Sequence, residues 1–187
     1  MSVFSNPASG AAEHAPRYIR AVLDLLGNRD PLEVLRETPN VLAKMLEASS
    51  PSEISRPEAP GKWSVGQVLA HLADSELVWG YRLRRVLAED RPVLHGYDQD
   101  LWADRLGYPT ADPAASLQRF TVLRGSHVTL LEGLSPEAGQ RAGVHPERGE
   151  ETVTHMLRLY AGHDLAHLRQ VARVLSGARP PTTGQQG

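Results

Sequence analysis

The stretch Tyr160-Ala161-Gly162-His163-Asp164-Leu165-Ala166-His167 lies inside a helical pattern that we expect to run from Thr152 to Ser176, because this segment contains no proline and one glycine. Histidines four residues apart on a helix lie one turn apart on the same face. His163 and His167 could therefore bind one metal ion together. Such a pair also arises on helices by coincidence, so a third ligand elsewhere in the chain decides between the two interpretations.

Composition limits the class of protein. The chain has 187 residues, enough for one domain with a sizeable core. Its 20 basic and 22 acidic residues give a net charge of -2, which provides no electrostatic reason to expect nucleic acid or an anionic membrane as a partner. There is no cysteine, so any metal ligand must be His, Asp or Glu.

The chain shows no targeting or membrane signal. The first residues lack the apolar core of a signal peptide, and no apolar run is long enough to span a bilayer. We therefore expect a cytoplasmic protein with a disordered lead-in at residues 1–15, one domain at residues 16–177 and a loose tail at residues 178–187.

Local signals predict the helices. An N-terminal helix is expected in pieces, beginning after Pro16 and restarting at Asp30-Pro31 and at Thr38-Pro39, because Asp or Thr before proline is typical of a helix start. A Pro/Ser-rich loop should follow at residues 49–61. Ser64 with Gln67 forms a capping-box pattern at the start of a second helix.

The remaining helices and connections follow in order. The second helix should end near Glu89, the third should run from Asp112-Pro113 to Leu131, and the fourth is the segment quoted above. Long connections are expected at residues 91–111, with a short helix from Asp98 to Leu106, and at residues 134–150. Alternating β-branched runs are absent, so we predict an all-α four-helix bundle with long connections.

His71 is the candidate third ligand. It lies on the arc of the second helix that Val68 and Leu72 also occupy, which is the side facing the core. A buried histidine can be an ordinary hydrogen-bonded core residue, but facing helices of a bundle also supply metal ligands. Three imidazoles in one core would suit Zn, Ni, Co or Fe and leave positions open for water or substrate.

Several segments resemble one family in the same order. They are Lys62-Trp63-Ser64-Val65-x-Gln67-Val68-x-x-His71-Leu72-x-Asp74-Ser75-Glu76, Tyr97-Asp98-x-x-x-Trp102-Ala103, His145-Pro146-Glu147-Arg148-Gly149-Glu150 and Leu159-Tyr160-Ala161-x-His163-x-x-x-His167. The pattern over roughly residues 30–176 resembles the DinB-like superfamily, and within it the YfiT branch. That branch is described as metal-dependent hydrolases and is related to bacillithiol S-transferases.

The resemblance implies an up-down-down-up bundle that is often dimeric and holds a divalent metal, nickel or zinc. The matching ligand positions are His71, His163 and His167. The characterised enzymes of the family activate low-molecular-weight thiols. The family's fourth helix is usually richer in histidine, whereas this chain has Ala166 and Gln170 at those positions. We therefore expect the surroundings of the triad to differ from those of the family.

Further residues are candidates for the site. Glu76 could serve as a general base, or alternatively pair with an arginine or orient a ligand. Tyr97 and Trp102 could line the mouth of the site and contact a bound molecule, although Trp102 could equally be a core residue.

Three functions follow from these expectations. The first is an S-transferase that takes a low-molecular-weight thiol as cosubstrate and acts on a small-molecule substrate. The second is a hydrolase of a small ester or amide with water as the nucleophile. The third is a metal-stabilised dimeric stress-response or binding module without catalysis, and a homodimer is expected in each case.

Overall fold

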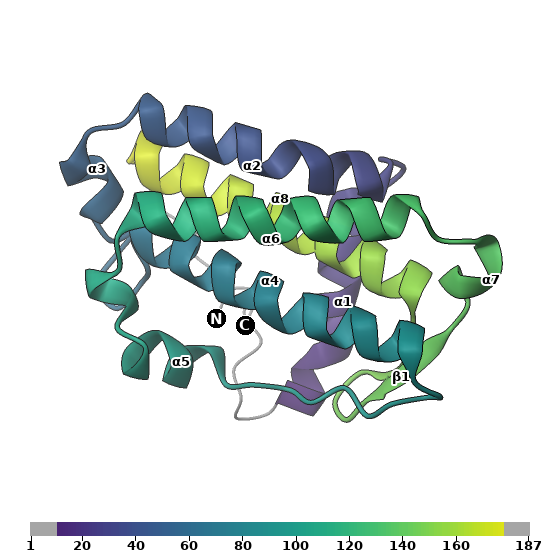
Figure 1. The fold of residues 1–187 in the computed structure, drawn as a ribbon. Coiled ribbons are helices and arrows are strands. Elements are labelled where there is room, and N and C mark those ends of the chain that lie inside the picture. Colours follow the sequence, from purple (N-terminus) through teal and green to yellow (C-terminus); the bar gives the residue numbers. More distant parts are fainter. Residues whose placement is uncertain (1–10, 178–187) are drawn as a thin grey trace.

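Four long helices lie side by side in the computed structural model, which describes residues 11–177 (Figure 1). They are α2 (Pro31–Glu47), α4 (Val65–Ala88), α6 (Pro113–Glu132) and α8 (Val153–Ser176). Helices α2 and α4 each pack against both α6 and α8. Figure 1 shows that α4 and α6 run in the same direction, opposite to α2 and α8. The predicted four-helix bundle with up-down-down-up topology is thus confirmed.

An additional helix, α1 (Ala11–Leu26), packs against α8. The two backbones approach closely at Gly162, where an added Cβ would lie 2.2 Å from the carbonyl oxygen of Val22. The lead-in was predicted to extend to residue 15, but residues 11–15 already belong to α1 and Ala15 is fully buried. Pro16 lies inside this helix instead of opening it. The remaining lead-in and the expected tail at residues 178–187 lie outside the described residues.

Helix α2 passes through Pro39 without a break, so the predicted restart at Thr38-Pro39 is wrong. Proline lacks the N–H that would bond to the carbonyl four residues earlier. That carbonyl, on Leu35, accepts a hydrogen bond from Arg124 Nη1 of α6 at 2.9 Å instead. The neighbouring Thr38 hydroxyl donates to the carbonyl of Val34 at 2.8 Å. A side chain from another helix thus replaces the bond that the proline removes.

The helix starts follow the local signals. Ser64 and Gln67 form both bonds of a capping box, at 3.0 and 3.3 Å. The carboxylate of Asp112 caps α6. The hydroxyl of Thr152 accepts from the backbone N–H of His155 at 3.1 Å and begins α8.

The connections contain more structure than the sequence indicated. The loop after α2 includes α3 (Pro51–Ser55), and the connection after α4 includes α5 (Gln99–Arg105), as predicted, and a 3₁₀ turn η1 (Tyr108–Thr110). The last connection holds α7 (Pro136–Gly139) and an antiparallel hairpin of β1 (Ala142–His145) and β2 (Gly149–Thr152). The hairpin was not predicted, because four-residue strands are too short to show an alternating pattern.

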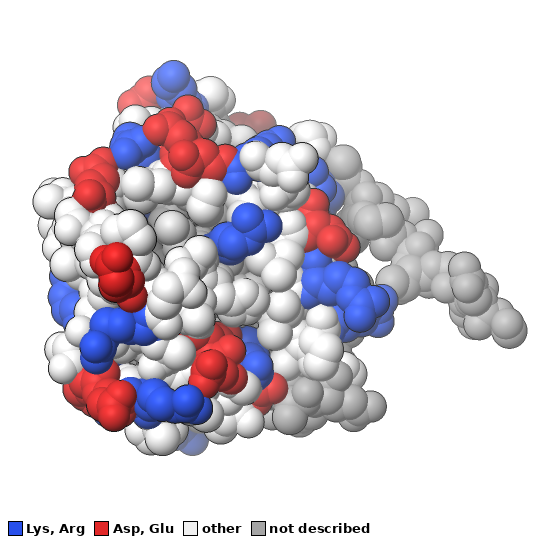
Figure 2. Space-filling model, turned by 90° about the vertical axis from the view of Figure 1, so that its right-hand side faces the viewer, with Lys and Arg blue, Asp and Glu red and all other residues white. Residues whose placement is uncertain are grey.

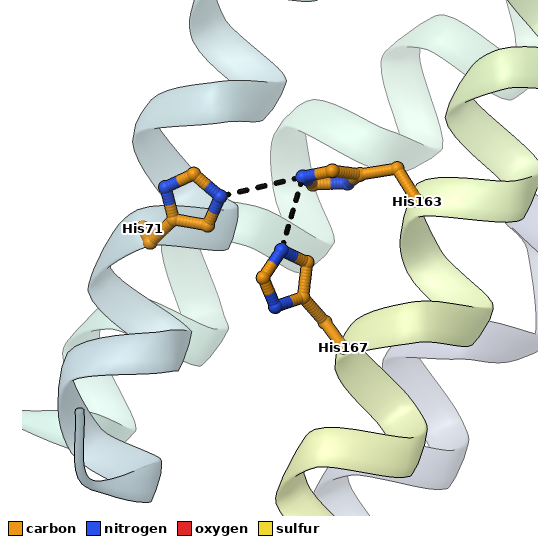
Figure 3. A group of neighbouring side chains, drawn as sticks. All are labelled: His71, His163 and His167. Carbon is orange, nitrogen blue, oxygen red and sulfur yellow. Dashed lines mark hydrogen bonds between the residues drawn. The ribbon is translucent and has the colours of Figure 1, made fainter. Parts of the chain in front are cut away.

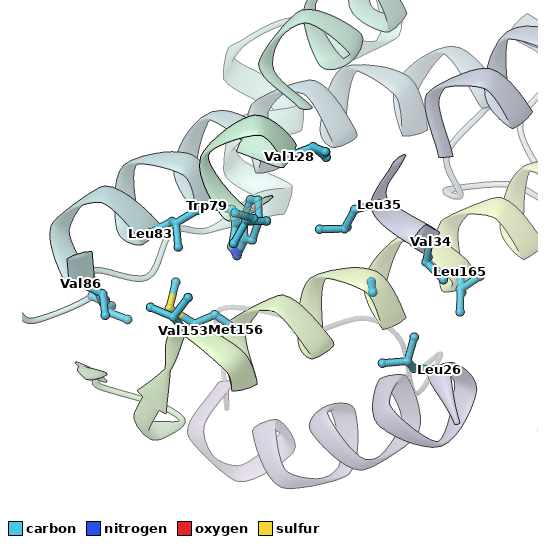
Figure 4. Close-up of a cluster of buried hydrophobic side chains, with 13 residues drawn as sticks. Leu26, Val34, Leu35, Trp79, Leu83, Val86, Val128, Val153, Met156 and Leu165 are labelled. Carbon is cyan, nitrogen blue, oxygen red and sulfur yellow. The ribbon is translucent and has the colours of Figure 1, made fainter. Parts of the chain in front are cut away.

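The apolar core consists of two large clusters and a small third one formed by Ala70, Ala103 and Tyr108. The larger one draws on α1, α2, α4, α6 and α8 (Figure 4) and includes Trp79 and Leu83 of α4 with Leu165 of α8. The other large one lies towards the start of α4 and the end of α8, where Leu72 and Val171 belong to it. Along α4 and α8, buried polar residues lie between the members of the two large clusters, among them Ser75, Glu76 and His167.

The surface carries both signs of charge. On the face towards the hairpin end, basic and acidic side chains are interspersed (Figure 2). None of the helices in residues 11–177 is long and apolar enough to cross a membrane.

Candidate metal site

The structure brings the three predicted histidines together where α4 and α8 face each other (Figure 3). His163 lies in the middle, with its Nε2 atom 3.3 Å from Nε2 of His71 and 3.1 Å from Nε2 of His167. His71 and His167 are buried, at 2% and 9% exposure, and His163 is partly exposed. We call these three residues the triad.

The donor set of the triad fits a divalent cation. Burial, and after it the charges of the neighbouring histidines, holds the pKa of His71 well below its ordinary value and lowers that of His167 to about 3, so both are neutral imidazoles. Two nitrogens bound to one tetrahedral zinc lie about 3.3 Å apart at the usual Zn–N distance. A single proton on His163 Nε2 can make only one good hydrogen bond to the two neighbouring Nε2 atoms, whereas one cation can accept a lone pair from all three nitrogens.

Contacts around the triad fix the rings. The Nδ1 atom of His167 lies 2.9 Å from Oε1 of Gln170, so the Nδ1 proton donates to the amide and Nε2 is left with a lone pair that faces the other imidazoles. The ring of His71 packs against Trp63 at 5.0 Å between centroids, and that of His163 packs against Tyr160 at 5.3 Å. Gln170 thus orients a triad member.

A cavity of about 120 Å³ opens next to the triad. Its wall includes Ser75, whose hydroxyl lies 3.3 Å from His71 Nε2 and 2.8 Å from the hydroxyl of Tyr97. Tyr97 therefore lies at the cavity, as predicted. Trp102 does not line it: this ring packs behind Tyr97, at 4.5 Å between centroids, and faces a neighbouring apolar groove.

The structure does not bring Glu76 to the cavity. This carboxylate is fully buried on the side of α4 that faces α6, where Arg124 donates to both of its oxygens at 3.0 and 2.8 Å. His127 Nδ1 lies 2.7 Å from one of the same oxygens. Arg124 also donates to Asp164 of α8 at 2.5 and 3.1 Å. Both oxygens of Glu76 are therefore engaged. Of the roles considered for this residue, the structure shows the ion pair with an arginine and does not place the carboxylate where a general base would act.

Comparison with known proteins agrees with this geometry. The family model described as the DinB superfamily matches residues 35–171, which include all three members of the triad. The chain belongs to the DinB superfamily. A relative from Bacillus subtilis, named "Putative metal-dependent hydrolase YfiT", is 33% identical over 146 residues, which cover 76% of this chain and 82% of that protein.

Two further relatives of this DinB-superfamily chain carry the same hydrolase name. The one from Bacillus licheniformis is 29% identical over 138 residues and covers 73% of this chain and 78% of its own. The one from Oceanobacillus iheyensis is 29% identical over 137 residues, with coverages of 73% and 79%. The solved structure of YfiT from Bacillus subtilis, described as having an unusual four-helix bundle topology, matches with a TM-score of 0.70, 31% identity and coverages of 78% and 86%.

Sequence reasoning missed some residues of this DinB-superfamily site. Gln170 was expected only to make the surroundings of the triad differ from those of the family, yet its spacing of three residues from His167 places the two side chains next to each other on a helix. Arg82 lines the cavity and lies 11 residues after His71, which returns to the same face of α4. His145 of β1 also lines the cavity, and only the hairpin, which has no clear sequence signal, places it there.

Replacing Gln170 with alanine should weaken metal binding about 10–100-fold, because partners that orient a ligating histidine typically contribute that much. Titration of zinc or nickel into the metal-free protein measures the change. The matched control is Arg169→Ala, an exposed neighbour on the same helix. Equal affinities in the two variants would show that the amide does not orient His167.

Proposed function

We propose that this DinB-superfamily protein is a metal-dependent transferase that activates a low-molecular-weight thiol at His71, His163 and His167, with nickel or zinc as the ion. The observation that supports it most directly is the position of the triad at a cavity that has no free carboxylate beside it. Among the described residues, the carboxylates that line the cavity are Glu147 and Glu151. Both come from the hairpin end and not from the helices that carry the triad.

The chemistry of the nucleophile favours a thiol. A divalent ion on three neutral imidazoles would keep its full charge and lower the pKa of a thiol or a water molecule in contact with it. A thiol in that position loses its proton outright, whereas water in zinc hydrolases is commonly assisted by a carboxylate base. Glu76, the candidate base, is occupied by Arg124 and His127. The thiol must come from a cosubstrate, because the chain has no cysteine.

Residues of the chain itself can position the reactants. The Ser75 and Tyr97 hydroxyls, 2.8 Å apart, offer a hydrogen-bonding pair next to His71. Burial raises the pKa of Tyr97 although its bond to Ser75 lowers it, so the phenol stays protonated at neutral pH and can donate. The rings of Trp79 and Tyr160 stack at 4.3 Å and give the cavity an apolar wall.

A hydrolase of a small ester or amide is the second candidate. The observation that favours it is the name of the relatives, which refers to metal-dependent hydrolysis. Water would then be the nucleophile, and turnover would need no added thiol.

Assays with and without thiol separate the candidates. The purified protein, with its metal content measured, is incubated with low-molecular-weight thiols and a haloalkyl electrophile, and in parallel with small esters and amides alone. Thioether formation that requires the triad supports the transferase. Hydrolysis without thiol would reject the transferase and support the hydrolase. A bound metal without turnover in either assay would reject both enzymes and support a non-catalytic binding module.

The proposal includes a small-molecule substrate, a homodimer and a location in the cytoplasm. The 120 Å³ of the cavity favours a small substrate. Light scattering at several protein concentrations measures the oligomeric state directly.

A further inference from the structure

The end of the cavity away from the triad has a different chemistry. Arg82 of α4 forms this end together with His145, Arg148 and Glu151 of the hairpin region. Along α4, Arg82 follows His71 by 11 residues, which corresponds to about 16 Å of helix. The cavity therefore has the triad towards one end and a group of basic side chains towards the other.

Arg82 is a buried cation without an acidic partner. It is 8% exposed, and no carboxylate of residues 11–177 forms a salt bridge with it. Its Nε and Nη2 atoms both donate to the backbone carbonyl of His95, with Nε at 3.1 Å. That carbonyl carries only a partial charge, and a guanidinium has five N–H groups. A buried charge is normally paired, so Arg82 has unused capacity to bind an anion.

The acidic groups at this end pair with Arg148, and the charge of Glu151 acts on Arg82 only without a direct contact. Glu151 accepts two hydrogen bonds from Arg148, at 2.5 and 3.0 Å, and the two side chains form a bidentate salt bridge with no net charge. Glu147 also lines the cavity and contributes a negative charge that acts on Arg148. These acids leave the charge of Arg82 without a direct counterion.

His145 supplies a second free donor. It is 1% exposed, and its Nδ1 atom accepts from the backbone N–H of Glu147 at 3.2 Å. The ring proton is therefore on Nε2, which is buried and has no hydrogen-bond partner among the described residues. Burial, with the charges of Arg148 and Arg82, lowers the pKa of His145 to about 3 although Glu151 raises it, so the ring is neutral. A buried N–H without a partner carries an energetic cost that a bound acceptor would remove.

We propose that Arg82 and His145 bind the carboxylate of a small substrate, whose reacting group then points along the cavity towards the triad. One oxygen accepts from the free N–H groups of Arg82 and the other from Nε2 of His145. A carboxylate fits better than a phosphate, because Glu147 and Glu151 line the same end and would repel a second negative charge, and because the cavity is small. The reacting group's place at the triad rests on the proposed function, whereas carboxylate binding does not.

Binding of short carboxylates tests the proposal without any assay of activity. Butanoate and hexanoate are titrated into the full-length protein by calorimetry in a buffer free of carboxylate and phosphate, with butanamide and inorganic phosphate as the comparison ligands. We expect a carboxylate to bind at least tenfold more tightly than the amide. No preference over the amide, or tighter binding of phosphate, would overturn the proposal whatever the variants do.

Variants locate the binding site. Arg82→Gln should weaken butanoate binding at least tenfold, since hydrogen bonds to charged groups are the strong ones, and the metal content should stay unchanged. The matched control is Arg85→Gln, which replaces an arginine on the same helix that pairs with Glu89 and does not line the triad cavity.

The triad provides the decisive comparison. His163→Ala should still bind butanoate, because the proposed carboxylate site lies at the other end of the cavity. Loss of binding in His163→Ala, with binding retained in Arg82→Gln, would place the carboxylate at the triad and reject the proposal. A protein that binds butanoate through Arg82 but transfers no thiol would refute only the proposed function.

Discussion

Replacing Arg124 with methionine should lower the free energy of unfolding by about 3–5 kcal/mol, the cost of removing one partner from a buried ion pair. The guanidinium is 1% exposed and bonds Glu76, Asp164 and the carbonyl of Leu35. Methionine fills similar space but leaves two carboxylates buried without their counterion. Urea denaturation followed by circular dichroism measures the loss.

A surface arginine provides the control for this prediction. Arg36 pairs with Glu33 and Glu132 in an exposed setting, where ion pairs contribute little. Arg36→Met should therefore unfold at nearly the same urea concentration as the original protein. If Arg124→Met behaves in the same way, the buried network does not hold the helices together.

His163→Ala should abolish metal binding. His163 is the central member of the triad, within 3.3 Å of both other imidazoles, and its removal leaves two nitrogens on separate helices. Elemental analysis should find metal in the original protein and none in the variant. Because a ligand at 100 times its dissociation constant stabilises the native state by about 2.7 kcal/mol, added zinc or nickel should raise the melting temperature of the original protein only.

The control on the same helix is His155→Ala. This histidine lies in the first turn of α8 and does not line the cavity. The variant should keep both the metal content and the response of the melting temperature. Equal metal loads in His163→Ala and His155→Ala would mean that the triad is not the metal site.

The sequence predicted those parts of the fold that depend on neighbours in the chain. The caps at Ser64, Asp112 and Thr152 each involve residues within three positions, so their patterns are visible directly. The break at Pro39 was predicted wrongly because the group that compensates for it, Arg124, lies 89 residues after Leu35. No local pattern can reveal a partner at that distance.

The candidate site shows the same division. Helical spacing and the family resemblance selected His71, His163 and His167, and the structure brings them together. Glu76 does face inward as the periodicity indicated, but its partner is on α6, 48 residues later. The charge of a neighbouring helix, and not the orientation of the glutamate itself, decides what this carboxylate can do.

The separation of the triad along the chain has a consequence for folding. His71 and His163 are 92 residues apart, so their imidazoles meet only after α4 and α8 have packed together. A chain that has formed only one of the two helices offers at most the pair on α8. In the chain-entropy model, a cross-link that closes a loop of roughly 100 residues stabilises the native state by about 4–5 kcal/mol. An ion at the triad would act as such a cross-link. It could bind all three histidines only after α4 and α8 have packed together, so metal binding would follow the assembly of the bundle.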